Sequence, residues 1–272
     1  MFSSARPVVV ALAATLLIAS CGSDDTANTS TDTVADTTVV ESTVVETTVG
    51  TTPGTTETTV ESTTATTEAS TQDIDADIAA SQTALLTLAD FPDGWTEAPP
   101  AGDAAAAIDV SLAECLGADS LTSSDTQSMS SMFTSADGNY IVSERVGLQA
   151  TEQDARIVLA GVTNPDVPAC FAAAYTTVGA AASSAGAIPE GAEIGEVTAS
   201  RLAVGSAGDA TQAIRVVIPF TSADGATQIT VDHVLIRSGR SLAALTFEAR
   251  VEPTAVEAID AITTAAASHL PV

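Results

Sequence analysis

Residues 210–221 read ATQAIRVVIPFT and carry the clearest strand pattern in the chain. Four apolar residues fall on one face at a spacing of two: Ile214, Val216, Ile218 and Phe220. Such alternation is typical of a strand with one face against a core. Three further strand-like segments lie around it, at 193–204, 226–237 and 241–250. Together they predict an antiparallel meander in the C-terminal part of the chain.

Helices and two more strands are predicted around this meander. Helices are expected near 104–116, from about 151, from about 164 and after 252, and strands at 129–134 and 139–149. In the second of these strands Glu144 interrupts an otherwise apolar face. Thr151 and Asp154 have the spacing of a capping box at a helix start. The pattern predicts an α+β fold, with a mostly antiparallel sheet of about six strands packed with helices as an α/β/α-like sandwich.

An acidic run opens the folded part. Asp73, Asp75 and Asp77 have the spacing that begins a calcium loop, but Ile78 and Ala84 stand where the loop needs Gly and Glu. The better interpretation is a helix whose acidic residues lie at its positive N-terminal end, continuing through residues 84–86. A six-residue sequence, FTSADG, occurs at both 133–138 and 220–225. Two hairpins with similar turns explain it better than an internal duplication.

The N-terminus has the pattern of an export signal. One Arg precedes an apolar stretch at 7–19 (PVVVALAATLLIA), which is shorter than a membrane-spanning helix requires. The stretch ends in Ile18-Ala19-Ser20-Cys21, which resembles a bacterial lipobox. That resemblance implies a lipoprotein signal peptide at 1–20 and lipidation of Cys21, with palmitate-type chains holding the protein in the membrane. The alternative is an ordinary secretory peptide cut near Ala19.

Residues 21–72 follow as a predicted tether that begins at Cys21. Residues 22–72 contain 20 Thr and nine acidic residues, and no aromatic residue, Leu, Ile or Met. Such a low-complexity segment cannot bury enough apolar surface to fold, so we expect it to be disordered. Whether the threonines are glycosylated or bare stays open. A single globular domain is then expected at 73–272.

The charge excludes some classes of function. The chain has 8 Arg and no Lys against 35 acidic residues, for a net charge of −27. Nucleic acid and polybasic membrane-surface binding both need clustered cations, so we expect neither. With Cys21 lipidated, Cys115 and Cys170 remain as an even pair in an exported domain, which predicts a disulfide. The alternative is two buried thiols.

A family resemblance covers most of residues 83–270. It rests on four short stretches: LLTLADFPDGWT at 85–96, CLG at 115–117, CF at 170–171 and DHVLIRSGR at 232–240. These resemble a group of actinobacterial exported lipoproteins, similar in style to the extracellular sensor domains of actinobacterial serine/threonine kinases. The resemblance implies a PsbP-like α/β/α sandwich in the cell envelope. It carries over no catalytic residues, and direct signalling by this chain does not follow from it.

Motifs for catalysis or cofactor binding are not found. The sequence has no Gly-rich nucleotide loop, His-Glu-x-x-His, Cys-x-x-Cys or nucleophile elbow. His233 and His269 are too isolated for a zinc site. The sequence therefore predicts no enzyme, no catalytic residue, no metal and no cofactor.

Four residues are candidates for ligand binding: Trp95, Arg201, Arg237 and Arg240. Grouped arginines on an acidic domain could bind a small anionic or amphiphilic ligand, or each could pair with a nearby acid. Trp95 could contact that ligand or plug the core. We expect a monomeric lipoprotein on the extracytoplasmic face of the cell membrane, and a non-catalytic binding or sensing module. The alternative is a structural or interaction lipoprotein whose partner is an envelope protein; an unrecognised hydrolase is the third hypothesis.

Overall fold

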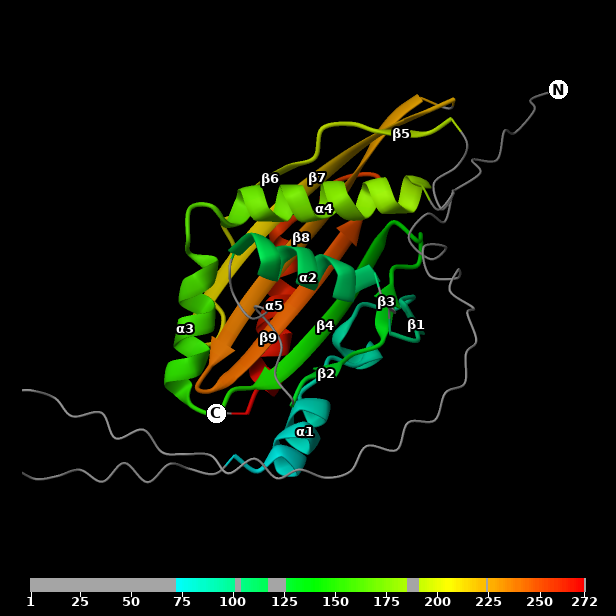
Figure 1. Ribbon diagram of the computed structural model, residues 1–272. Coiled ribbons are helices and arrows are strands. Elements are labelled where there is room, and N and C mark those ends of the chain that lie inside the picture. The colour runs from blue at the N-terminus through cyan, green and yellow to red at the C-terminus, as the bar shows by residue number, and fades with distance from the viewer. Residues whose placement is uncertain (1–71, 101–103, 117–125, 185–190, 224, 272) are drawn as a thin grey trace, which may run out of the picture. The chain divides into compact units, whose positions relative to one another are not determined.

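The strands β7 (Ala210–Ser222) and β8 (Gly225–Ser238) form a long antiparallel hairpin, and the sheet extends outward from it. On the far side of β8, β9 (Ser241–Ala249) pairs antiparallel, and β4 (Tyr140–Leu148) pairs antiparallel with β9. The sheet order is β1-β3-β4-β9-β8-β7-β5. The strands of the predicted meander are therefore consecutive in the sheet and lie on one side of β4 (Figure 1).

The computed structural model describes residues 72–100, 104–116, 126–184, 191–223 and 225–271. The predicted signal peptide at 1–20 and the tether from Cys21 to residue 71 lie outside the described residues. The α+β fold with a large antiparallel sheet and packed helices is confirmed within them.

Five short strands complete the sheet at its edges. They are β1 (Thr96–Ala98), β2 (Ser128–Met129), β3 (Met132–Thr134), β5 (Glu193–Ile194) and β6 (Thr198–Arg201). The described residues thus contain nine strands, where about six were expected. The segment predicted at 129–134 is divided at Ser130, whose hydroxyl accepts a hydrogen bond from the Glu144 amide at 2.9 Å. β1 has only three residues and is held by pairing with β3, so no local pattern predicts it.

Helices cover both faces of the sheet. Figure 1 shows α2 (Ala104–Leu116), α3 (Glu152–Val162) and α4 (Val167–Ser184) on one face and α5 (Val256–His269) on the other. We call these the three-helix face and the α5 face. The helix α1 (Ile74–Thr83) lies near β2 and β4, and the residues after it join the α5-face core.

Alternation along the strands supplies both cores. Ile214, Val216 and Ile218 of β7 pack on the three-helix face, as their spacing predicts, while Ala213 packs on the α5 face. Fully buried side chains on the α5 face include Phe133, Ile236, Leu245, Phe247 and Ile259. A sheet buried on both sides loses water from both faces, which accounts for the few polar side chains inside it.

Local sequence explains several helix ends. The carboxylate of Asp73 accepts from the Ala76 amide at 3.1 Å, so Asp73 is the N-cap of α1. Thr151 and Asp154 form the expected capping box of α3. The expectation that the first helix continues through 84–86 was wrong. α1 ends at Thr83, because the Leu86 amide donates to the buried Glu144 carboxylate at 2.7 Å and leaves the helical ladder.

The repeated FTSADG sequence lies at two hairpins. One copy joins β3 to β4, where Gly138 has φ +72° and Asp137 accepts from the Asn139 amide at 3.1 Å. The other copy ends β7 and begins β8. The first connection is longer than the second, so similar residues serve two different turns.

Cys115 of α2 and Cys170 of α4 form the predicted disulfide, with Cα atoms 5.6 Å apart. It joins two helices that lie side by side on the three-helix face (Figure 1). No single helix among the described residues has the length and hydropathy to cross a bilayer; only α3 and α4 taken together do, across a 77° bend.

We predict that the Cys115→Ser/Cys170→Ser variant unfolds at lower urea concentration than the wild type. The bond closes a loop across 55 positions, and the chain-entropy model then gives a loss of about 4 kcal/mol. Equilibrium urea unfolding of both proteins, with and without reductant, measures this loss. Reductant should lower the wild-type midpoint and leave the variant unchanged. Two free thiols at these positions in the denatured, non-reduced protein would contradict the bond.

Candidate functional site

Trp95 lies at the end of a row of aromatic rings. Its ring centroid is 4.8 Å from that of Phe91, which in turn stacks on Phe133 at 4.4 Å. Phe133 is fully buried and Trp95 is half-buried against the α5-face core. This packing is that of a plug on the core, one of the two alternatives for Trp95.

The three candidate arginines are bound to separate parts of the protein. Arg201 donates to the carbonyls of Val162, the last residue of α3, and Asn164, at 3.0 and 2.8 Å. Arg237 lies 3.3 Å from Glu152 and 3.0 Å from Asp209. Each guanidinium therefore already has protein oxygens as partners.

Arg240 has a stronger set of partners. It donates to both carboxylate oxygens of Asp77 in α1 and to the Gln149 carbonyl at 3.1 Å. The Asp77 side chain is only 5% exposed. The pKa of Asp77 is lowered, mainly by its hydrogen bond with Arg240, and that of Arg240 is raised by the same contact. The pair fastens α1 to the turn between β8 and β9.

The other arginines of the domain are also paired. Arg215 forms a two-point contact with the fully buried Asp232, at 2.6 and 2.8 Å, and donates to the Thr254 carbonyl. The remaining pairs are Arg145–Asp109, Arg156–Glu152 and Arg250–Glu248. In the described part of the chain, the arginines of the meander are thus held by ion pairs, except Arg201, whose partners are backbone carbonyls.

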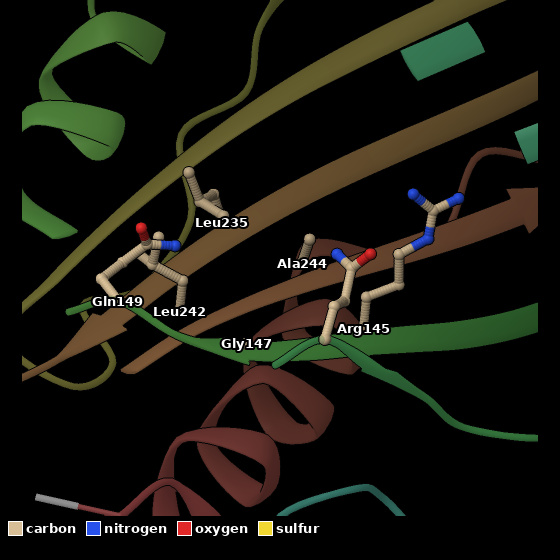
Figure 2. Close-up of a pocket in the computed structure, with 7 residues that line it drawn as sticks. Arg145, Gly147, Gln149, Leu235, Leu242 and Ala244 are labelled. Atoms are coloured by element: carbon tan, nitrogen blue, oxygen red, sulfur yellow. The ribbon is translucent and has the colours of Figure 1, made fainter. Parts of the chain in front are cut away.

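A shallow hollow lies on the three-helix face of the sheet, over β4, β8 and β9. Its lining is formed by Gln127, Arg145, Gly147, Gln149, Leu235, Leu242 and Ala244 (Figure 2). The hollow has a volume of about 10 Å³, which holds one water molecule. Neither Trp95 nor the three candidate arginines line it. Its size and lining do not form a small-molecule site.

His233 is wedged between the sheet and α4. Its Nε2 lies 2.7 Å from the Tyr175 hydroxyl, its Nδ1 lies 3.4 Å from the Thr246 hydroxyl, and its ring packs on Phe171 at 4.9 Å. Burial, with a smaller effect of Arg145, lowers the pKa of His233 to about 4. Burial also raises the pKa of Tyr175. Both rings are therefore neutral near pH 7, and no carboxylate contact to the imidazole occurs among the described residues.

Two buried acidic residues are not among the candidate site residues predicted from the sequence. Asp232 and Glu144 occupy inward positions of β8 and β4 and are 0% and 1% exposed. The signal for Glu144 is present in the sequence, because an acid breaks an apolar face of period two. The partner of each acid, however, is remote in sequence.

Comparison with known proteins finds neither a matching family model nor a matching curated protein. In the described residues, no group of three or more His, Cys, Asp or Glu could hold a metal ion.

We predict that burial of neutral His233 makes the protein less stable in acid. The pKa of His233 is about 4 in the folded protein and 6.5 in a solvated chain. Its contribution to the free energy of unfolding is therefore full above pH 6.5 and is lost as pH falls through 4. The difference in unfolding free energy between wild type and His233→Leu should change by about 3 kcal/mol from pH 7.5 to pH 4. Urea unfolding at both pH values measures it. A constant difference would contradict the depressed pKa.

Proposed function

We propose that this chain is an exported lipoprotein, anchored by lipid on Cys21 at the extracytoplasmic face of the membrane, whose folded domain is a non-catalytic binding module. The observation that carries the proposal is the Cys115–Cys170 disulfide. Structural disulfides persist in oxidising compartments and are rare in the cytosol. A disulfide in a chain that begins with an apolar leader ending in Ile-Ala-Ser-Cys supports export followed by lipidation.

The tether supports display away from the membrane. About 50 residues rich in Thr and acids separate Cys21 from α1. As a flexible coil, such a segment has a root-mean-square span of roughly 40 Å. That span suits a domain presented through cell-wall material. The resemblance to actinobacterial exported lipoproteins agrees with this proposal.

Within the binding role, the contacts favour a macromolecular partner over a small ligand. Arg201, Arg237 and Arg240 are already bound to protein oxygens, and Trp95 packs on Phe91. The hollow on the three-helix face has room for only about one water molecule. Within the proposed binding module we therefore favour a macromolecular partner, such as an envelope protein, over a small amphiphile or anion. The Tyr175 and Thr246 contacts of neutral His233 support a structural role for this histidine, which disfavours the hydrolase.

We predict that Cys21→Ser releases the protein from membranes. The wild-type chain, expressed in a bacterium with lipoprotein processing, should sediment with membranes, dissolve in detergent and incorporate labelled fatty acid. The variant should incorporate no label and appear in the soluble extracytoplasmic fraction, because the lipid chains supply the membrane affinity. The Cys115→Ser/Cys170→Ser variant is the matched control and should stay in the membrane fraction. A Cys21→Ser protein that remains in the membrane would refute the anchor.

A second prediction separates the two binding hypotheses. The Cys21→Ser chain, purified from the extracytoplasmic fraction, should give a native mass that equals its polypeptide and any glycan, because the hollow on the three-helix face has room for only about one water molecule. The same sample, denatured, supplies the reference mass. A non-covalent adduct of a few hundred daltons, lost on denaturation, would favour the small-ligand hypothesis. Loss of that adduct in Arg237→Ala would place the ligand at the meander arginines.

A further inference from the structure

The residues that join α1 to the sheet form a short strap over the α5 face. The strap runs from Ala84 to Phe91 and includes the 3-10 turn η1 (Leu88–Asp90). Ala84, Leu86 and Phe91 are 1%, 3% and 8% exposed and belong to the α5-face core. Trp95, the one tryptophan of the chain, packs on Phe91 where the strap ends.

A hydrogen bond from Leu86 to Glu144 joins this strap to β4. Glu144 lies in β4 between Val142 and Val146, faces Leu245 across the β9 pairing, and is 1% exposed. One carboxylate oxygen, Oε2, accepts the Leu86 amide proton at 2.7 Å. The other, Oε1, is buried and has no hydrogen-bond partner in the described part of the chain.

The charged groups around Glu144 do not compensate a negative charge. Asp90 of η1 is a second acidic group near Glu144, and its negative charge raises the pKa of Glu144. From α5, His269 lies 3.4 Å from Asp90. From α1, Asp77 is occupied by Arg240. Arg145, the next residue of β4, points to the opposite face and pairs with Asp109 of α2.

An ionised carboxylate in this position lacks the partners that such burial requires. Buried charges are ordinarily paired and fully hydrogen-bonded, whereas Glu144 has a single neutral donor and an acid nearby. The protonated carboxyl still accepts from Leu86 and no longer repels Asp90. Desolvation, opposed by the Leu86 hydrogen bond and reinforced by Asp90, raises the pKa of Glu144 to about 7.

We propose that Glu144 is a protonation-controlled latch: its neutral carboxyl holds residues 84–91 on the sheet, and its ionisation loosens this strap while the rest of the sheet stays folded. The strap is the first connection between α1 and the sheet. The latch would therefore act on the segment that follows the tether, and it needs no ligand. An exported domain, as proposed above, meets external pH directly, but the latch itself rests only on the fold.

The direction of the pH effect follows from the two protonation equilibria. The pKa is about 7 with the strap closed and 4.5 when the carboxyl is solvated. Closure is therefore most favourable below pH 4.5 and loses this contribution as pH rises through 7. Between pH 5 and pH 8 the opening equilibrium should increase on the order of 50-fold.

The test uses the full-length chain and two local reporters. Amide hydrogen exchange at Leu86, corrected for the intrinsic pH dependence, measures opening, and Trp95 fluorescence measures the environment of the strap end. In the wild type both should change with a midpoint near neutrality, while amides of β8 stay protected. In Glu144→Gln, which keeps an acceptor for Leu86 and cannot ionise, both should be independent of pH.

The matched control is His269→Gln, because His269 is the other titratable group near Asp90. It should preserve the wild-type transition. A transition that disappears in His269→Gln and persists in Glu144→Gln would overturn the proposal. Titration of the Glu144 carboxyl carbon by NMR in the wild-type protein decides the matter even if Glu144→Gln does not fold. A midpoint near 4.5 would overturn the latch and leave the proposed lipid anchor unaffected.

Discussion

Burial of the central sheet on both faces is the constraint on which the rest of the structure depends. α2, α3 and α4 exclude water from one face and α5 from the other, so any polar side chain pointing inward must find its partner inside the protein. Asp232 finds Arg215, and His233 finds Tyr175. Glu144 finds only the Leu86 amide. A buried polar group whose hydrogen bonds are all satisfied fixes the packing around it. A buried group that lacks a partner, such as Glu144, can change its protonation state with pH.

The sequence predicts those parts of the fold that depend on local chemistry. The alternation of β7 places Ile214 and Val216 on one face, the Thr151–Asp154 spacing marks the start of α3, and the cysteine count identifies the Cys115–Cys170 bond. Among the edge strands β1 escapes prediction, since its three residues depend on pairing with β3. The predicted segments 129–134 and 193–204 each divide into two short strands, β2 with β3 and β5 with β6. The partner of Arg240 escapes for the same reason. Arg240 and Asp77 are 163 positions apart, and nothing local relates them.

His233 and Glu144 act on stability in opposite directions over nearly the same pH range. The pKa of the buried histidine is lowered to about 4 and that of the buried acid is raised to about 7. As pH rises from 4.5 to 6.5, folding gains from the first group what it loses from the second. The two contributions therefore oppose each other in the free energy of global unfolding, whereas opening of the strap depends on Glu144 alone, since His233 lies on the opposite face of the sheet.

The contact between α1 and the β8–β9 turn also determines how the domain transmits force. Gln72 donates to the Leu148 carbonyl and to Asp77, and Asp77 in turn is bound by Arg240. Tension applied through the preceding residues reaches this small set of polar contacts before it reaches any apolar core. Load on this segment is therefore carried first by α1 and its polar contacts, ahead of the sheet that is buried on both faces.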